Sequence, residues 1–218
     1  MLQTLVPLVD DLSRELPDSE RYRRLLEAVR ALLPCDAAAL LRLEGPWLVP
    51  VAVNGLSGDT MGRRFKVDEH PRFRVLLEAS GPTRFLADSA LPDPYDGLVE
   101  GLPGLLEVHD CMGCPVHIDG KPWGVLTLDA LARERFSVDN LGDLQAFASL
   151  AAATVSVVQR IERLALRIED ERQRAESYRA LATDGSLPVL AGQSAAHQHL
   201  LDDIAIVGNS DLILICLQ

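Results

Sequence analysis

A helical pattern of about 40 residues constrains this chain more than any other feature. From Val138 onward, apolar or small residues recur at alternating spacings of three and four, at Phe147, Leu150, Thr154, Val157, Ile161, Leu164 and Ile168. This spacing is the a/d seam of a coiled coil. Packing on the chain's own sheet would explain residues 139–158 but not the charged extension beyond Ile168. We therefore expect the helix to pair with a second copy of itself.

The residues before this helix alternate between helical and strand-like patterns. Amphipathic helical spacing is found at 4–16, 19–33 and 71–79, and short apolar, strand-like runs at 37–43, 47–53, 83–86, 108–118 and 123–128. Residues 56–69 and 88–106 are polar or rich in glycine and proline, so we expect loops there. This order predicts an α+β fold, with an antiparallel sheet and helices on one face.

Composition and charge exclude several classes of function. The 218 residues include 21 basic and 32 acidic side chains, a net charge of −11, whereas nucleic-acid binding requires a basic face. Four cysteines are too few for a disulfide framework in a chain of this length. The N-terminal residues carry acids where a signal peptide would be basic, and we find no apolar run long enough to span a bilayer. We expect a cytoplasmic protein without a membrane partner.

The sequence contains no glycine-rich phosphate loop, no dinucleotide-binding fingerprint, no G-x-S-x-G elbow and no H-E-x-x-H motif. Cys111 and Cys114 form a single C-x-x-C, which is a weak zinc or redox signal without a second pair. On a strand these two cysteines would point to opposite faces of the sheet. We therefore do not expect them to share a metal or a disulfide.

Five potential metal ligands lie in segments that a hairpin would bring together. His109 and Cys111 are two residues apart on one strand, so they project from the same face. Asp93 and Asp96 lie in the proline-bracketed loop upstream, and Asp129 ends the next strand. Each aspartate alone is typical of a turn, and a histidine beside a buried cysteine is commonly a core feature. Together they suit a borderline metal such as iron or zinc, with an arginine nearby to offset the negative charge.

Several strings in the chain resemble the GAF sensor region of the NorR family of nitric-oxide-responsive bacterial regulators. The resemblance covers most of residues 1–180. It is carried by CDAAALLRL at 35–43, NGL at 54–56, MGRRF at 61–65, HPR at 70–72, RFLADSALPDPYDGL at 84–98, VHDCMGCP at 108–115 and GVLTLD at 124–129. It implies a GAF-type antiparallel sheet flanked by helices and followed by a long C-terminal signalling helix.

The resemblance also implies a mononuclear non-haem Fe(II) that binds nitric oxide as the effector. Carried over residue by residue, the candidate ligands are Asp96, Asp93, His109, Cys111, Asp129 and Arg72. A guanidinium has no lone pair to offer, so we expect Arg72 to offset the carboxylate charge beside the metal. At most five of the six can bind iron if one position stays open for the gas. Among them, we expect Asp96, which precedes the flexible Gly97, to matter most.

In that family the sensor is followed by an AAA+ ATPase that drives sigma-54 RNA polymerase, and by a DNA-binding domain. By this resemblance, residues 1–158 form the sensor with its N-terminal helices, 159–182 the signalling helix, 183–190 a linker, and 191–218 the truncated start of the ATPase. We expect no phosphate-binding loop and therefore no enzyme activity. DNA and sigma-54 RNA polymerase would be contacted only through domains that this chain lacks.

The sequence thus predicts a nitric-oxide-sensing domain that controls its own AAA+ ATPase and forms a homodimer through the helix at 147–168. In one alternative, the GAF domain senses an organic small molecule without a metal and the acids are turn residues. In another, Cys111 is a nucleophile and His109 its base, although the sequence shows no oxyanion motif or third orienting group.

Overall fold

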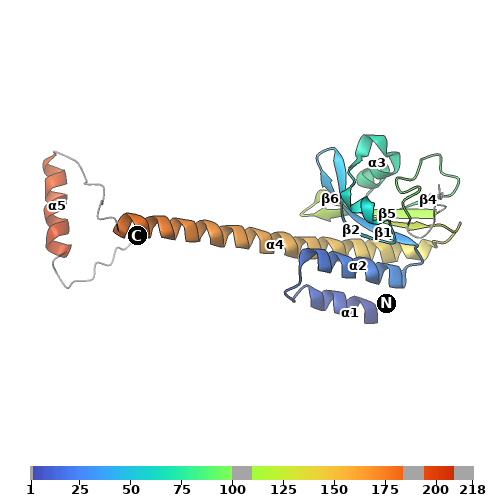
Figure 1. Cartoon of the computed structure of the whole chain (residues 1–218), viewed down its shortest axis with the longest axis horizontal. Coiled ribbons are helices and arrows are strands. Elements are labelled where there is room, and N and C mark those ends of the chain that lie inside the picture. Colours follow the sequence, from blue (N-terminus) through green and yellow to red (C-terminus); the bar gives the residue numbers. More distant parts are fainter. Residues whose placement is uncertain (1, 100–109, 184–193, 209–218) are drawn as a thin grey trace. The chain divides into compact units, whose positions relative to one another are not determined.

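The computed structural model describes residues 2–99, 110–183 and 194–208 (Figure 1). Internal contacts divide the chain into two compact units, Met1–Arg163 and Leu164–Gln218. The first unit contains the sheet and the candidate site. The second contains the end of the long helix and one further helix, α5 (Ala195–Gly208).

Six antiparallel strands form a single sheet in the first unit, in the order β3-β2-β1-β6-β5-β4. They are β1 (Ala37–Glu44), β2 (Trp47–Asn54), β3 (Phe65–Lys66), β4 (Thr83–Leu86), β5 (Asp110–Ile118) and β6 (Lys121–Ala130). The register places Cys111 of β5 directly opposite Asp129 of β6, and Phe85 of β4 opposite Cys111. Two hairpins, β1–β2 and β5–β6, therefore meet along the β1–β6 pairing at the middle of the sheet.

Helices cover both faces of this sheet. The helices α2 (Asp18–Leu32) and α4 (Val138–Thr183) share one apolar core with Ala38, Leu40 and the even-numbered residues at the middle of β5. The helix α3 (Pro71–Glu78) packs on the opposite face, where Ala39 and Leu41 point. Figure 1 shows α3 on the other side of the strands from α2 and α4. The expectation of helices on one face only is thus corrected by α3.

The helix α2 shows why these segments are helical and where their stability comes from. Tyr22, Leu25, Leu26 and Val29 recur at three- and four-residue spacing and are all buried, whereas the opposite side is charged. Each fully buried leucine side chain stabilises the fold by about 1.5–3 kcal/mol. On the outer side of α2 lies α1 (Leu2–Asp11), which the sequence places at 4–16.

The segment at 56–69 differs from the predicted loop. It contains two short 3-10 helices, η1 (Gly58–Gly62) and η2 (Val67–Glu69), with the two-residue strand β3 between them. Phe65 is buried among the aromatic rings of Phe73 and Tyr95 and pairs with Leu48 of β2. Tertiary packing of one aromatic residue therefore creates a strand that local sequence does not show.

The long helix predicted from Val138 is confirmed as α4, which runs without interruption for 46 residues. Phe147 and Thr154 of the heptad seam are buried within the first unit, whereas Ile161 and Leu164 are about half exposed. Among the described residues, α4 is also the one helix long and apolar enough to cross a bilayer by length and composition. Its apolar character is accounted for in part by packing, since Leu144, Phe147 and their neighbours are core residues.

Candidate metal centre

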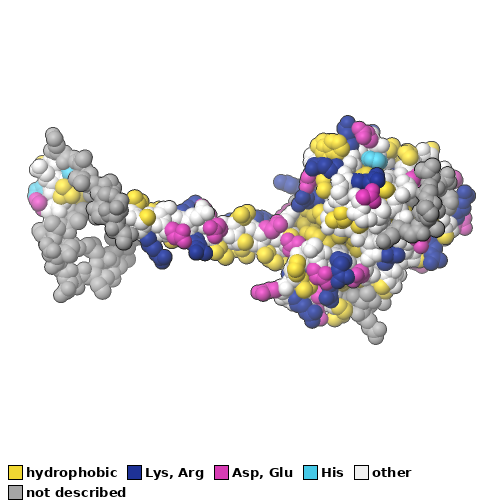
Figure 2. Space-filling model, in the orientation of Figure 1, with side chains coloured by type: hydrophobic (Ala, Val, Ile, Leu, Met, Phe, Trp, Pro, Cys, Tyr) yellow, Lys and Arg dark blue, Asp and Glu magenta, His cyan; other side chains and the backbone are white. Residues whose placement is uncertain are grey.

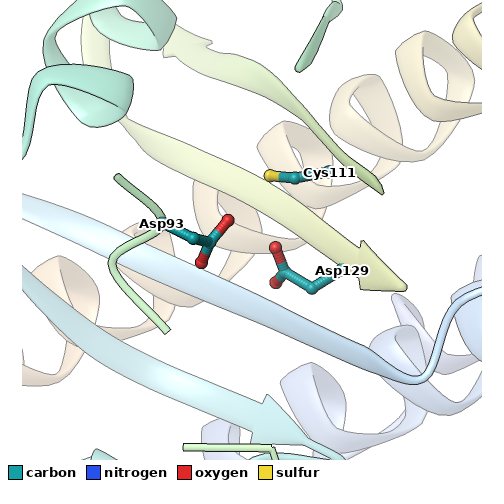
Figure 3. Close-up of side chains that lie close together, drawn as sticks. All are labelled: Asp93, Cys111 and Asp129. Carbon is teal, nitrogen blue, oxygen red and sulfur yellow. The ribbon is translucent and has the colours of Figure 1, made fainter. Parts of the chain in front are cut away.

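Three potential metal ligands converge on one buried point of the α3 side of the sheet. One ligand atom from each of Asp93, Cys111 and Asp129 lies within 4.8 Å of the others (Figure 3). All three residues are buried. Figure 3 shows the two carboxylates facing each other with the thiol above them. The structure therefore brings together three of the six residues predicted from the sequence.

Backbone register and one anchored turn position these three side chains. Cys111 and Asp129 are paired directly across the β5–β6 ladder and point to the same face. Asp93 lies in the turn that follows β4, where its Oδ1 accepts a hydrogen bond of 2.8 Å from the backbone N–H of Tyr95. The Tyr95 hydroxyl, fully buried, lies 3.0 Å from the Thr127 hydroxyl of β6. This contact ties the turn to the same strand that carries Asp129.

Arg72 supplies a positive charge at the edge of the cluster. It lies in the first turn of α3 and is 5% exposed. Its Nη1 donates to Oδ2 of Asp93, and its Nε donates to the carbonyl oxygen of Leu91 at 2.8 Å. Its guanidinium also lies over the ring of Phe85, 5.3 Å from the centroid. These contacts agree with the predicted role of Arg72 as a cation that offsets carboxylate charge.

The charges of Asp129 and Cys111 are not balanced by the described residues alone. Both carboxylate oxygens of Asp129 are buried, and the Cys111 thiol is the one hydrogen-bonding neighbour that the described residues offer them. Burial, and then the nearby Asp93 charge, raise the pKa of the Asp129 carboxyl well above its ordinary value. Burial and the Asp129 charge likewise raise the pKa of the Cys111 thiol. The pKa of Asp93 is raised by burial, while Arg72 opposes this increase.

This arrangement fits a divalent cation. Two carboxylates and a thiolate would carry three negative charges, which Arg72 and one divalent cation together neutralise. A mixed oxygen and sulfur donor set suits iron or zinc better than magnesium or calcium. The Asp129 oxygens and the Cys111 sulfur are the atoms a cation would engage, and their protons would leave on binding. A buried carboxylate without a balancing charge is otherwise costly to retain.

The remaining two predicted ligands, Asp96 and His109, are not among the three residues that the structure brings together. Asp96 is exposed one turn beyond Asp93, outside the cluster, although it is near enough for its charge to raise the pKa of Asp93. His109 lies outside the described residues. The predicted opposition of Cys111 and Cys114 is confirmed, since Cys114 belongs to the core under α4.

Sequence reasoning missed Tyr95 and Thr127 as residues that support the site. Their hydroxyls meet across 32 positions of the sequence, so no local pattern links them. The available signal was the aromatic residue between Asp93 and Asp96 in a polar loop. Such a residue is buried when the loop folds back onto the sheet.

Comparison with known proteins identifies the fold. The model of the GAF domain family matches residues 19–155, more than half of the chain. The chain belongs to the GAF domain family. The expected GAF-type sheet with flanking helices and a long C-terminal helix is thereby confirmed. The predicted boundaries at 158, 182 and 190 stay predictions.

Relatives over nearly the whole chain are regulators. The nitric oxide reductase transcription regulator NorR1 of Cupriavidus necator is 41% identical over 215 residues, which cover 96% of this chain and 40% of that protein. The anaerobic nitric oxide reductase transcription regulator NorR of Serratia proteamaculans is 39% identical over 219 residues, covering 97% of this chain and 41% of that protein. The resemblance seen in the sequence is confirmed. This GAF chain spans about two fifths of the length of these relatives.

Solved structures agree with the fold. The GAF domain of a phosphoenolpyruvate-protein phosphotransferase from Coxiella burnetii aligns with a TM-score of 0.60 at 22% identity, covering 74% of this chain and 96% of that chain. The corresponding domain from Acinetobacter aligns with a TM-score of 0.59 at 16% identity, covering 73% and 95%. At such identities the likeness shows the GAF fold alone.

Proposed function

We propose that this GAF domain senses nitric oxide through one non-haem Fe(II) and regulates a transcription activator. The buried convergence of Asp129, Cys111 and Asp93, whose combined charge Arg72 alone does not balance, carries the metal part of the proposal. The names of the relatives described above, which are nitric oxide reductase transcription regulators, support the nitric oxide part. The domain is proposed to be a sensor and not an enzyme.

Asp93, Cys111 and Asp129 form the centre of the proposed ligand set. His109, two residues before Cys111, and Asp96, in the same turn as Asp93, complete the set carried over from the family. Arg72 balances charge through its contact with Asp93. Iron, when bound, supplies the chemistry that captures nitric oxide. The protein holds it in a buried setting, where charges interact more strongly than they do in water.

The regulatory partner is proposed to be an AAA+ ATPase in the same polypeptide. This chain corresponds to about 40% of each relative, which leaves room for further domains in a full-length protein. Residues 159–182 are proposed to carry the signal, 183–190 to form a linker, and 191–218 to begin the ATPase. The sensor restrains the ATPase until nitric oxide binds. Contacts with DNA and sigma-54 RNA polymerase then belong to the other domains, in the cytoplasm.

The exposed part of α4 is proposed to form a homodimer. Ile161, Leu164 and Ile168 are 49%, 57% and 69% exposed and continue the a/d seam of the buried part of the helix. Figure 2 shows hydrophobic side chains exposed along this stretch of α4, interspersed with charged ones. Phe147 and Thr154 are buried within the sensor itself. The part of the predicted 147–168 seam that can contact a second copy therefore begins near Val157.

Anaerobic loading with Fe(II) followed by nitric oxide tests the proposal directly. We expect about one iron per chain and the electron paramagnetic resonance signal of a ferrous nitrosyl complex. Asp129→Ala should abolish both while the circular dichroism spectrum is retained. If wild-type protein binds no iron under these conditions, the proposed function is wrong, and the metal-free alternative with an organic ligand takes its place.

The two cysteines of β5 provide a matched pair for a second measurement. Both are buried, but Cys111 faces the candidate site and Cys114 faces the core under α4. With Co²⁺ in place of iron, Cys111→Ser should lose the sulfur-to-cobalt charge-transfer absorption, because thiolate ligation is lost. Cys114→Ser should keep it. Loss in both variants would indicate disruption of the strand and not of a ligand.

A further inference from the structure

Neighbouring residues of β5 connect the two faces of the sheet. Successive side chains of a strand point to opposite faces. Cys111 therefore points to the candidate metal site, whereas Asp110, its covalent neighbour, points away from it. Asp110 is 1% exposed and pairs in register with Ala130, the residue after Asp129. A displacement of β5 at Cys111 thus displaces Asp110 as well.

The Asp110 carboxylate joins three elements through short, directed contacts. The guanidinium of Arg84 in β4 donates two hydrogen bonds to it, from Nε to Oδ1 at 2.8 Å and from Nη2 to Oδ2 at 2.6 Å. Oδ2 also accepts a 3.0 Å hydrogen bond from the backbone N–H of Phe136. Since the carboxylate side chain has no exposed surface, water does not compete for these bonds.

Phe136 lies two residues before α4. Its side chain is 2% exposed and belongs to the core between the sheet and α4, which begins at Val138. Two residues earlier, Glu134 has a φ of +53°, in the left-handed region that costs free energy for a residue with a Cβ. Such a conformation persists only when neighbouring contacts fix the backbone. The Asp110–Phe136 hydrogen bond is one of these contacts.

We propose that Asp110 is a positioning residue that couples the candidate metal site to the start of α4. This inference rests on the function proposed above. A change of the ligand set that displaces β5 alters the length and angle of the Asp110–Phe136 hydrogen bond. Because the strength of a hydrogen bond depends steeply on its angle, a small displacement at Cys111 changes how firmly the first residues of α4 are held. In this proposal, the Asp110–Phe136 hydrogen bond transmits the change at the metal site to the start of α4.

Amide hydrogen exchange of the segment around Phe136, measured on the whole chain loaded with Fe(II), tests this coupling. Adding nitric oxide to the wild type should change the exchange rate of the Phe136 amide by about tenfold, the scale of one charge-assisted hydrogen bond. Asp110→Asn keeps the shape but removes the charge. It should retain the nitrosyl signal, while the exchange response falls below about twofold.

Asp59→Asn is the matched control, because Asp59 also pairs with an arginine, Arg63 at 2.9 Å, but on the exposed surface. It should keep the full response. If the role of Asp110 were purely structural, Asp110→Asn would lower the melting temperature and leave the response to nitric oxide unchanged. That result would overturn the inference. If Asp110→Asn does not fold, Arg84→Lys is the second variant. It keeps the positive charge but loses the forked contact that holds Asp110, so the exchange response should again fall while the nitrosyl signal is retained.

The outcomes separate this inference from the proposed function. Without a nitrosyl signal in the wild type, both are wrong. With the signal present, an unchanged Phe136 exchange rate in the wild type overturns only the coupling. The same holds if the nitric oxide response persists in Asp110→Asn. A response that is lost in Asp110→Asn and retained in Asp59→Asn supports the coupling.

Discussion

Two buried aspartates at the ends of one hairpin have opposite surroundings, and this difference predicts opposite effects of substitution. Asp129 has only the weakly donating Cys111 thiol beside it among the described residues, whereas Asp110 is held by Arg84 and Phe136. In the metal-free protein, Asp129→Asn should raise the free energy of unfolding by about 1–3 kcal/mol at neutral pH. Asp110→Asn should lower it by a similar amount. Chemical denaturation of both variants gives the comparison.

The pH dependence of the metal-free protein follows from the same carboxyl group. Burial raises the folded-state pKa of Asp129, so its contribution is fully present below the ordinary aspartate pKa of about 3.9. That contribution is lost as the pH rises through the raised value. The wild type should therefore lose stability as the pH rises above the ordinary aspartate value, and Asp129→Asn should lose less. An equal slope in both proteins would contradict this account. A bound divalent cation should reverse the trend, because it replaces the protons.

At this scale the sequence indicates which candidate residues can meet better than it indicates how they are arranged. The motif strings place Asp93, Cys111 and Asp129 in segments that the sheet brings together, and strand pairing explains why. The burial of Arg72 and the exposure of Asp96 depend on how the turn after β4 folds back. The contact between Tyr95 and Thr127 helps to hold this turn on the sheet, and no local pattern reveals it because the two residues are far apart in the sequence.

Among the elements, the central strand β6 tolerates no side chain at Gly124. A Cβ there would lie 1.9 Å from the backbone oxygen of Leu41 in the neighbouring strand β1. Gly124→Ala should therefore force the β1–β6 pairing apart and cost about 3 kcal/mol or more. Gly142→Ala is the control, since Gly142 lies in α4 with open space around its Cα, and alanine favours a helix by about 1 kcal/mol. Thermal melting of both variants should show opposite shifts.

The elements that the sequence predicts well are those with a local signature. The two hairpins with Gly45 and Asp119-Gly120 at their turns, and the heptad pattern of α4, are present as expected. β3 was missed because two residues carry no periodicity and its burial depends on Phe73 and Tyr95. The position of α3 on the opposite face is likewise a tertiary property.

For the whole molecule, the proposed homodimer predicts that only seam positions of α4 control the oligomeric state. Leu164→Asp should convert the dimer to monomer, because it places a charge at a d position of the seam. Leu166→Asp is the matched control, since Leu166 is more exposed, at 72% against 57%, but lies on the opposite side of the helix. Analytical ultracentrifugation of both variants tests this. If the wild type stays monomeric at high concentration, the proposed homodimer is wrong and the seam serves packing within one chain.

The arginines beside the seam predict how such a dimer responds to salt. In a parallel pair, the g position of one helix faces the next e position of the other, which sets Arg167 against Arg172 of the second copy. Intrahelical ion pairs such as Arg172–Glu176 at 3.1 Å offset this repulsion only in part, because they are exposed. Screening should therefore strengthen the dimer severalfold between about 0.1 M and about 0.5 M salt. Weakening by salt would instead indicate attraction between unlike charges and a different partner for this helix. The proposed dimer is held by apolar contacts against its own charge, so its association should respond to small changes in the packing of α4.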